Sequence, residues 1–199
     1  YEIFSEQKRT LVALEDIPEE LKNGVIATED AAFYEHKGIR PLSILRSLVY
    51  GVLGKSRLGG GASTLTQQLV KNGILTNERT ITTKIKEIVL SVRLEQKYEK
   101  NQILQIYFNE IPYGSTNYGI QSASENYFGK PVQELTLAES ATLAGIPKAP
   151  TRYLNNTEAL KTRRNFVLRR MYEEGFITKE EKESAQSQPL ELKKQFDSM

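Results

Sequence analysis

The spacing of apolar residues predicts that most of the chain is α-helical. In the segment that begins at Pro41, apolar positions recur three and four residues apart, as on one face of a helix; they are Ile44, Leu45, Leu48, Val49, Val52 and Leu53. A similar stripe in residues 79–98 is formed by Ile81, Ile85, Ile88 and Val92. Residues 1–14 instead contain two short β-prone stretches, YEIF and TLVAL. We therefore expect a mainly α fold preceded by a short N-terminal β-hairpin.

Residues typical of helix ends place the first and middle helices. Pro18 and the two acids after it suit a first turn, because proline loses no hydrogen bond there and acids meet the positive end of the helix dipole. This helix would end near Glu29. The sequence TLAE at 136–139 is a capping box, which opens a helix that ends before Pro147.

The remaining helices follow from the same signals. Residues 64–72 and 100–108 have a helical pattern, and in the second of them Leu104, Tyr107 and Phe108 are expected to face inward. Thr157 is expected to cap the last long helix, which Gly175 closes, and TKEE at 178–181 forms another capping box.

Length and composition limit the classes of function. The 199 residues fit a single domain, residues 1–199, in which 1–14 form a lead-in and 188–199 a tail or linker. The absence of cysteine and the single histidine, His36, exclude disulfides, thiolate metal sites and multi-histidine metal sites, and we predict no metal-ligand set. The net charge of +2, from 27 basic and 25 acidic side chains, indicates no nucleic-acid partner.

The start of the chain indicates a piece of a longer protein. The first residue is Tyr1 rather than methionine. No apolar run approaches the ~20 residues that cross a bilayer, so a transmembrane anchor is absent from this fragment.

Two adjacent acids, Glu29 and Asp30, follow the apolar sequence VIAT at the end of the first helix. Carboxylates are mildly unfavourable at the negative end of a helix dipole. Their position there indicates that the carboxylates are used, although a solvated helix end is the alternative interpretation.

A glycine-rich stretch leads into the helix at residues 64–72. Free backbone N–H groups and the positive end of a helix dipole bind anions, and Lys71 would share a face with Gln67 and Gln68. The alternative is that Thr64 and Gln67 only form a capping box. A nucleotide-binding loop at residues 54–56 is excluded, because Val49 stands where that motif needs glycine.

A third charged segment is ERTITTKIKE, residues 78–87. Arg79 and Glu87 would lie about 80° apart around a helix, so both could border one cleft. An ordinary solvated helix face is the alternative. A pair of carboxylates that flanks a sugar linkage is a known requirement of glycosidic chemistry, but sequence spacing does not decide whether Glu29 and Glu87 converge. The residues alone predict a cleft for an anionic ligand.

Taken in order, five segments resemble the motifs of the peptidoglycan glycosyltransferases, which include the monofunctional transglycosylases and the N-terminal domain of class A penicillin-binding proteins. The segments are EDAAFYEHKG, GASTLTQQLVKN, KIKE, KNQILQIYFNEIPYG and RRNFVL, at residues 29–38, 61–72, 84–87, 100–114 and 163–168. The chain departs from the family pattern at Thr83, where arginine is usual, and at Gln105, where glutamate is usual.

This resemblance implies a lysozyme-like fold with a helical head lobe and a smaller jaw lobe. It assigns Glu29 as the general base, and Lys71 and Arg79 as the cations that bind the donor pyrophosphate. Glu87 matches the second essential acid, which orients those cations or contacts a divalent ion, Mg or Mn; no other cofactor is implied. The other matching cleft positions are Asp30, Arg46, Ser63, Gln67 and Gln68.

The implied substrates are lipid II and the growing lipid-linked glycan strand, at the extracytoplasmic face of the cell membrane, where other cell wall synthesis proteins could also be partners. The apolar helix that begins at Pro41 is interrupted by Arg46, Lys55 and Arg57, which suits partial burial in an anionic membrane surface. Packing in the core is the alternative for that helix. Two rival functions are a glycan-cleaving enzyme, with Glu29 as the acid, and a non-catalytic module that binds lipid-linked precursors.

Overall fold

The computed structural model describes residues 10–52, 63–73, 80–114, 117 and 119–193. In these residues helices are the regular secondary structure, and no β-strand longer than an isolated bridge is present. This confirms the prediction of a mainly α fold. Most of the expected N-terminal hairpin, residues 1–9, lies outside the described residues, and residues 10–13 form no strand.

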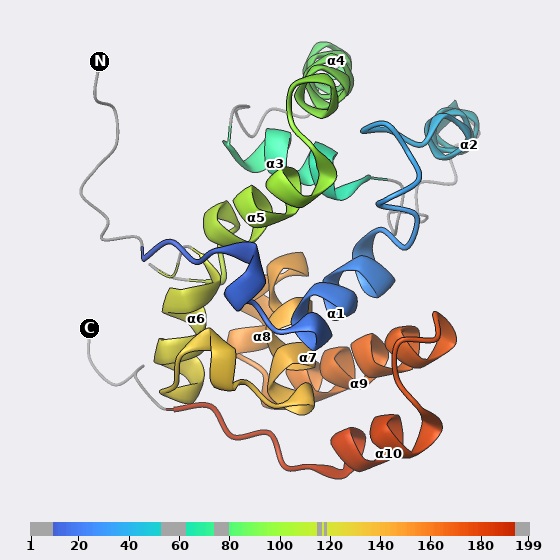
Figure 1. The fold of residues 1–199 in the computed structure, drawn as a ribbon. Coiled ribbons are helices and arrows are strands. Elements are labelled where there is room, and N and C mark those ends of the chain that lie inside the picture. Colours follow the sequence, from blue (N-terminus) through green and yellow to red (C-terminus); the bar gives the residue numbers. More distant parts are fainter. Residues whose placement is uncertain (1–9, 53–62, 74–79, 115–116, 118, 194–199) are drawn as a thin grey trace. The chain divides into compact units, whose positions relative to one another are not determined.

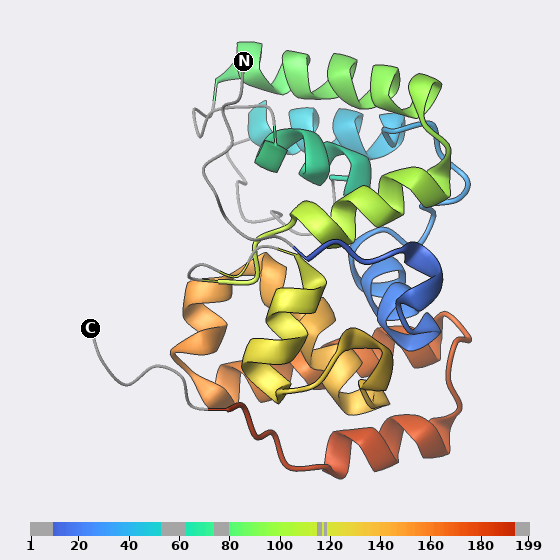
Figure 2. The same cartoon turned by 60° about the vertical axis from the view of Figure 1, so that its left-hand side comes forward.

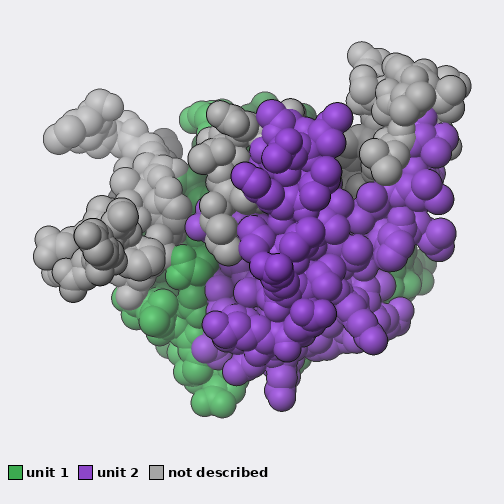
Figure 3. Space-filling model, turned by 90° about the horizontal axis from the view of Figure 1, so that it is seen from above, with its two compact units in different colours: residues 1–25, 108–199 green, residues 26–107 purple. Residues whose placement is uncertain are grey.

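The chain divides into two compact units, coloured separately in Figure 3. Unit 1 comprises Tyr1–Val25 and Phe108–Met199, and unit 2 comprises Ile26–Tyr107. The division into two units agrees with the expected two lobes. The prediction of a single domain for residues 1–199, with its lead-in and tail, stays a prediction.

The helices of the two units are labelled in Figure 1. Two helices, α1 (Glu19–Glu29) and α5 (Lys100–Glu110), contain the boundaries between the units. Unit 2 also contains α2 (Pro41–Val52), α3 (Leu65–Gly73) and α4 (Ile81–Lys97). Unit 1 also contains η1 (Leu14–Asp16), α6 (Ile120–Phe128), η2 (Val132–Glu134), α7 (Leu137–Gly145), η3 (Ile146–Lys148), α8 (Pro150–Leu154), α9 (Thr157–Glu173) and α10 (Lys179–Ser187).

Unit 1 is built around the packing of α7 against α9. Helices α8 and α10 also pack against α9 (Figure 2). The capping box predicted at 136–139 is present, with both reciprocal hydrogen bonds between Thr136 and Glu139. Leu143, Val167 and Leu168 are fully buried, and a Cβ on Gly24 would lie 3.3 Å from the Cβ of Ala144, so α1 packs closely against this core.

One buried charge belongs to unit 1. Arg164, in the fifth motif, is fully buried and donates to the carbonyl oxygens of Gln186 and Gln188 at 3.0 and 2.9 Å. These groups lie at the C-terminal end of α10, where cations stabilise the unpaired carbonyls. Burial lowers the pKa of the Arg164 guanidinium. The fifth motif is therefore structural here: it fastens α10 to α9.

Unit 2 contains the helices of the candidate site, and α3 lies against α4 (Figures 1 and 2). Its inner faces are partly polar: Glu87 and Ser91 are the buried side chains of α4. Its outer faces are partly apolar. In α2, Leu42, Leu45 and Val49 are 82%, 58% and 49% exposed. In α4, the exposed apolar side chains are Ile81, Ile85 and Val89.

Several sequence-based details are corrected by the structure. The cap of α9 is Asn156 rather than Thr157, because the Asn156 side chain accepts the hydrogen bond from the Ala159 amide. The stripe predicted in residues 79–98 is helical, but its first two members, Ile81 and Ile85, face outward. The inward orientation of Leu104, Tyr107 and Phe108 is confirmed.

Candidate active site

Glu29 is the last residue of α1, and its carboxylate is partly exposed. The turn before it is anchored by Val25, Ile26 and Ala27, which are buried. The Gln68 side-chain amide on α3 donates to Glu29 Oε2 at 3.4 Å, a long hydrogen bond of the kind that catalytic groups often make before substrate binds. The structure thus brings two of the predicted site residues together.

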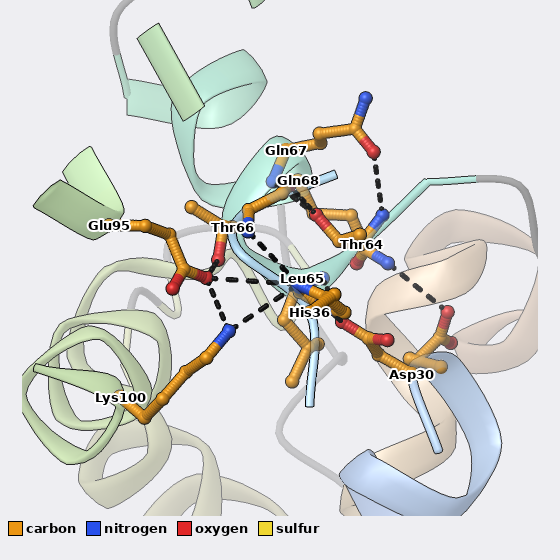
Figure 4. Close-up of polar contacts among 11 residues, drawn as sticks. Asp30, His36, Thr64, Leu65, Thr66, Gln67, Gln68, Glu95 and Lys100 are labelled. Atoms are coloured by element: carbon orange, nitrogen blue, oxygen red, sulfur yellow. Dashed lines mark hydrogen bonds and ion pairs between the residues drawn. The ribbon is translucent and has the colours of Figure 1, made fainter. Parts of the chain in front are cut away.

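Asp30 lies directly after α1 and is 1% exposed. Its Oδ2 accepts from the Leu65 backbone N–H at 3.0 Å and from His36 Nε2 at 2.7 Å (Figure 4). Leu65 is the first residue of α3, so the Asp30 carboxylate occupies the positive end of that helix dipole. The anion site expected at this helix start is therefore filled by a side chain of the protein itself, and Asp30 joins α1 to α3.

His36 is held in one tautomer by its neighbours. The Gly38 backbone N–H donates to His36 Nδ1 at 3.0 Å, so that nitrogen is an acceptor. The ring proton is therefore on Nε2, which donates to Asp30 Oδ2. The histidine of the first motif thus donates a hydrogen bond to the Asp30 carboxylate and fixes its position.

Gly38 allows the segment after α1 to approach α4 closely. Its φ of 96° lies in the left-handed region, and a Cβ there would lie 2.7 Å from the Ser91 carbonyl oxygen. Its own carbonyl oxygen accepts from Thr64 Oγ1 at 2.6 Å. Any side chain at this position would push α4 away, which explains the glycine of the first motif.

Thr64 and Gln67 form the reciprocal capping hydrogen bonds that were the alternative interpretation of the second motif. The Gln67 N–H donates to Thr64 Oγ1 at 3.1 Å, and the Thr64 N–H donates to Gln67 Oε1 at 2.9 Å. Gln67 is fully buried, so in this structure it serves the start of α3. Its predicted contact with substrate stays a prediction.

Three buried polar atoms of the predicted site and its flanks have no hydrogen-bond partner among the described residues. They are Thr28 Oγ1, Asp30 Oδ1 and Gln67 Nε2. Such atoms are uncommon because each carries a desolvation cost of about 1–3 kcal/mol. Thr28 and Asp30 are the chain neighbours of Glu29, and Gln67 precedes Gln68, whose amide donates to Glu29.

Glu87 is 6% exposed and lies on α4. Lys84 Nζ donates to its Oε1 at 2.8 Å. The predicted role of Glu87 towards Lys71 and Arg79, or towards a divalent ion, stays a prediction. Among the described residues, no group of three or more histidine, aspartate or glutamate side chains is placed to hold a metal ion.

The remaining predicted site residues belong to different segments of unit 2. Lys71 is exposed in the last turn of α3, Arg46 is exposed on α2, and Ser63 is partly exposed before α3. Arg79 lies outside the described residues, as do residues 53–62, which include most of the glycine-rich stretch. Leu48 and Val52 belong to α2, but their side chains are outside the description.

Sequence reasoning missed an ion pair in this site. Glu95, near the end of α4, accepts from Lys100 Nζ at 2.7 Å, and Lys100 is the first residue of α5 (Figure 4). The break between two helices separates the partners, so no helical spacing rule indicates the pair. The break between the two predicted helices at residues 98–99 was the one sequence feature that brings Glu95 and Lys100 to facing helix ends.

Comparison with known proteins defines the class to which this fold and site belong. The sequence model of the transglycosylases matches residues 1–172. The chain therefore belongs to the transglycosylase family, which confirms the identification made from its motifs.

The similar proteins include several named penicillin-binding protein 1A. The chain is 46% identical over 191 residues to that of Aquifex aeolicus (strain VF5), covering 95% of this chain and 26% of the relative. It is 43% identical over 189 residues to that of Vibrio cholerae, covering 94% of this chain and 23% of the relative. The chain thus spans about a quarter of the length of these relatives.

A solved structure supports the fold. The 2.6 Å crystal structure of penicillin-binding protein 1A from Haemophilus influenzae matches with a TM-score of 0.56 and 27% identity, covering 94% of this chain and 19% of that chain. Fold class and family therefore agree.

Proposed function

We propose that this chain is a peptidoglycan glycosyltransferase domain that polymerises lipid II into β-1,4-linked glycan strands. The observation that carries the proposal is the pair of acids at the end of α1. Asp30 is buried and its Oδ2 accepts two hydrogen bonds, whereas Glu29 next to it is partly exposed. Membership of the transglycosylase family supports sugar transfer as the chemistry of that exposed carboxylate.

Glu29 is the general base of the proposed reaction. Its carboxylate takes the proton from the 4-hydroxyl of the acceptor GlcNAc as that oxygen attacks C1 of the donor MurNAc. The bond from C1 to the pyrophosphate oxygen breaks on the opposite side, so the anomeric centre is inverted and undecaprenyl pyrophosphate leaves. The Gln68 amide, 3.4 Å from Oε2, supports a fixed orientation of the base.

Lys71 and Arg79 are the proposed partners of the leaving pyrophosphate, with Ser63 and Gln68 beside them. Cations that meet charge as it develops lower the barrier more than cations that bind the ground state. Lys71 is exposed in the last turn of α3, the same helix that carries Gln68. Glu87, whose carboxylate is paired with Lys84, is the proposed second acid, which orients these cations or contacts a divalent ion.

Contact with the membrane surface belongs to the same proposal, because lipid II remains in the bilayer. Leu42, Leu45 and Val49 form an exposed apolar face on α2, beside the exposed Arg46. An apolar helix face with flanking cations suits an anionic interface. This exposure favours the interfacial interpretation of α2 over packing in the core. None of the helices in the described part of the chain meets the length and hydropathy of a membrane-spanning helix.

The experiment is incubation of the purified chain with lipid II in detergent, followed by gel separation of the glycan products and measurement of released undecaprenyl pyrophosphate. Longer glycan chains with matching release of pyrophosphate are expected. Shortening of preformed glycan would instead identify a glycan-cleaving enzyme. Binding of lipid II without either product would identify a non-catalytic module.

A further inference from the structure

The ammonium group of Lys100 lies among three groups of unit 2. Its Nζ is 2.7 Å from Glu95 Oε1, 3.4 Å from His36 Nδ1 and 4.7 Å from the centre of the Phe33 ring. The side chain is 19% exposed. Phe33 and His36 both belong to the segment that follows Glu29, so the first residue of α5 contacts that segment through a polar contact and a cation–π contact. Its ion pair with Glu95 joins it to α4.

Glu95 brings the start of α3 into the same cluster. Its Oε1 accepts from Thr66 Oγ1 at 2.8 Å in addition to Lys100. Its side chain is 8% exposed. A carboxylate this enclosed is costly unless its partners neutralise it. The Glu95 carboxylate is therefore neutralised by Lys100. Through its hydrogen bond with Thr66, it also fixes the second residue of α3.

Two short routes lead from this pair towards the proposed base, and their members Asp30, His36 and Thr66 are labelled in Figure 4. The first runs from Lys100 through His36 to the carboxylate of Asp30, the residue that follows Glu29. The second runs from Glu95 through Thr66 into α3, which carries Gln68 and its contact with Glu29. Both routes meet where the Leu65 N–H donates to Asp30.

We propose that Glu95 and Lys100 are a positioning pair for the reaction: they set the carboxylate of Glu29 against α3 without contacting the substrate. The proposal rests on the proposed function, in which Glu29 is the base. Because their effect passes through the geometry of Asp30, His36 and Thr66, loss of the pair should lower kcat and leave KM for lipid II nearly unchanged.

The test compares four variants in the polymerisation assay. Lys100→Met and Glu95→Gln should each lower kcat by about 10- to 100-fold, the effect of a displacement of the order of 1 Å at a reacting group, with KM within about twofold. Lys100→Arg keeps the charge and should retain most of the activity. Lys97→Met, which removes an exposed lysine at the end of α4, is the matched control and should not change kcat.

The double variant Glu95→Gln/Lys100→Met separates positioning from simple stability. Each single variant leaves one buried charge without its partner, whereas the double variant leaves none, so its melting temperature should recover towards that of the parent. Positioning requires that kcat stays low despite this recovery. If kcat recovers together with the melting temperature, the pair only stabilises the fold and the proposal is overturned.

Hydrogen exchange gives a readout that does not need activity. The Leu65 and Gly38 amides donate to Asp30 and His36, so both should exchange faster in the double variant, while amides in the core of α9 should not. Unchanged exchange at Leu65 and Gly38 would overturn the proposed routes. If the parent chain makes no polymer while these amides do respond, the proposed function fails and the structural coupling stands.

Discussion

The two units of the molecule differ in the charges that they bury and in the apolar side chains that they expose. Unit 1 has an ordinary core: its buried side chains are mainly apolar, and Arg164, the one fully buried charge in its described residues, ties α10 to α9. Its exposed large apolar side chains among the described residues are Leu11, Tyr172 and Phe176. This is the distribution expected when burial of apolar surface governs the choice of residues.

Unit 2 buries carboxylates in addition to apolar side chains, and it exposes apolar side chains on two of its helices. Asp30 and Glu87 are buried, and Glu95 is nearly so. On the outside, α2 and α4 expose Leu42, Leu45, Val49, Ile81, Ile85 and Val89. Neither feature stabilises the fold. A buried charge lowers stability unless its partners neutralise it, and apolar surface that remains exposed contributes no burial free energy.

The difference predicts how each unit should respond to substitution if unit 2 carries the proposed site. Where residues serve folding, a substitution should lower stability and spare turnover. Where residues serve the reaction or a membrane surface, a substitution should lower turnover or binding and spare stability. Each of the following variants tests one side of this comparison.

Replacing the proposed base should have the largest effect. In Glu29→Gln the side chain keeps its shape but no longer accepts the hydroxyl proton, so polymerisation should fall by about 10²- to 10⁴-fold. Affinity for lipid II should survive, because the lost interaction is made mainly in the transition state. Polymer formation and lipid II binding should be measured together. Polymer formation at a tenth of the parent rate would show that Glu29 is not the base, and Glu87 would become the first candidate.

Removing apolar volume from unit 1 should affect stability instead. Leu168 is fully buried in α9, so Leu168→Ala should lower the free energy of unfolding by about 3 kcal/mol through lost burial and a residual cavity. Turnover of the folded protein, assayed well below the melting temperature, should be unchanged. Glu158→Ala, at an exposed position of α9, is the control. A loss of kcat without a loss of stability would contradict the comparison.

Charging the apolar face of α2 should weaken membrane binding. Leu45 and Val49 are exposed, so Leu45→Glu/Val49→Glu should change the melting temperature little. Loss of their burial in an anionic interface should weaken binding to anionic vesicles by about tenfold or more. Tyr172→Glu/Phe176→Glu, on the exposed apolar residues of unit 1, is the matched control. Collapse of the melting temperature with unchanged vesicle binding would assign the α2 face to the core.

Much of the fold was predictable because its signals are local. The caps at Thr136 and Thr178 mark the starts of α7 and α10, where each threonine side chain accepts from an amide three residues on. Helix α6 was missed because its cap is Gly119, which offers no side chain, and because its sequence is rich in small polar residues. The five-residue α8 is too short for a periodic pattern.

The candidate site was predictable in part. The adjacent acids and the glutamines of α3 were found from their residue types, and the structure brings Glu29 and Gln68 together. Periodicity identified the apolar stripes of α2 and α4 but not their orientation, because the same spacing serves a core face and a surface face. The roles of Gly38 and Lys100 depend on contacts with distant segments, which no local pattern contains.

The smallest expected effect concerns a charge of unit 1. Glu139 Oε1 accepts from the Thr136 N–H at 3.0 Å and from Lys130 Nζ at 2.8 Å. Burial raises the pKa of this carboxyl, but the hydrogen bonds from Lys130 and Thr136 outweigh it, so the pKa lies below its ordinary value of 4.5. Glu139→Gln keeps an acceptor for Thr136 but loses the charge, so the free energy of unfolding at pH 7 should fall by about 1 kcal/mol.

The pH dependence of this loss follows from the direction of the pKa shift. A carboxyl whose pKa is lowered by folding stabilises the protein above its ordinary pKa, and the stabilisation disappears as the pH falls through the folded value. The difference in unfolding free energy between the parent and Glu139→Gln should therefore be constant near neutrality and shrink below pH 4.5. Denaturant titrations from pH 7 to pH 3 would measure it, with the exposed Glu134→Gln as the control. Because Glu139 serves the start of α7 in unit 1, turnover at pH 7 should not change. A carboxylate of unit 2 such as Glu95 should behave in the opposite way, so a turnover defect in Glu139→Gln would remove the distinction between the two units.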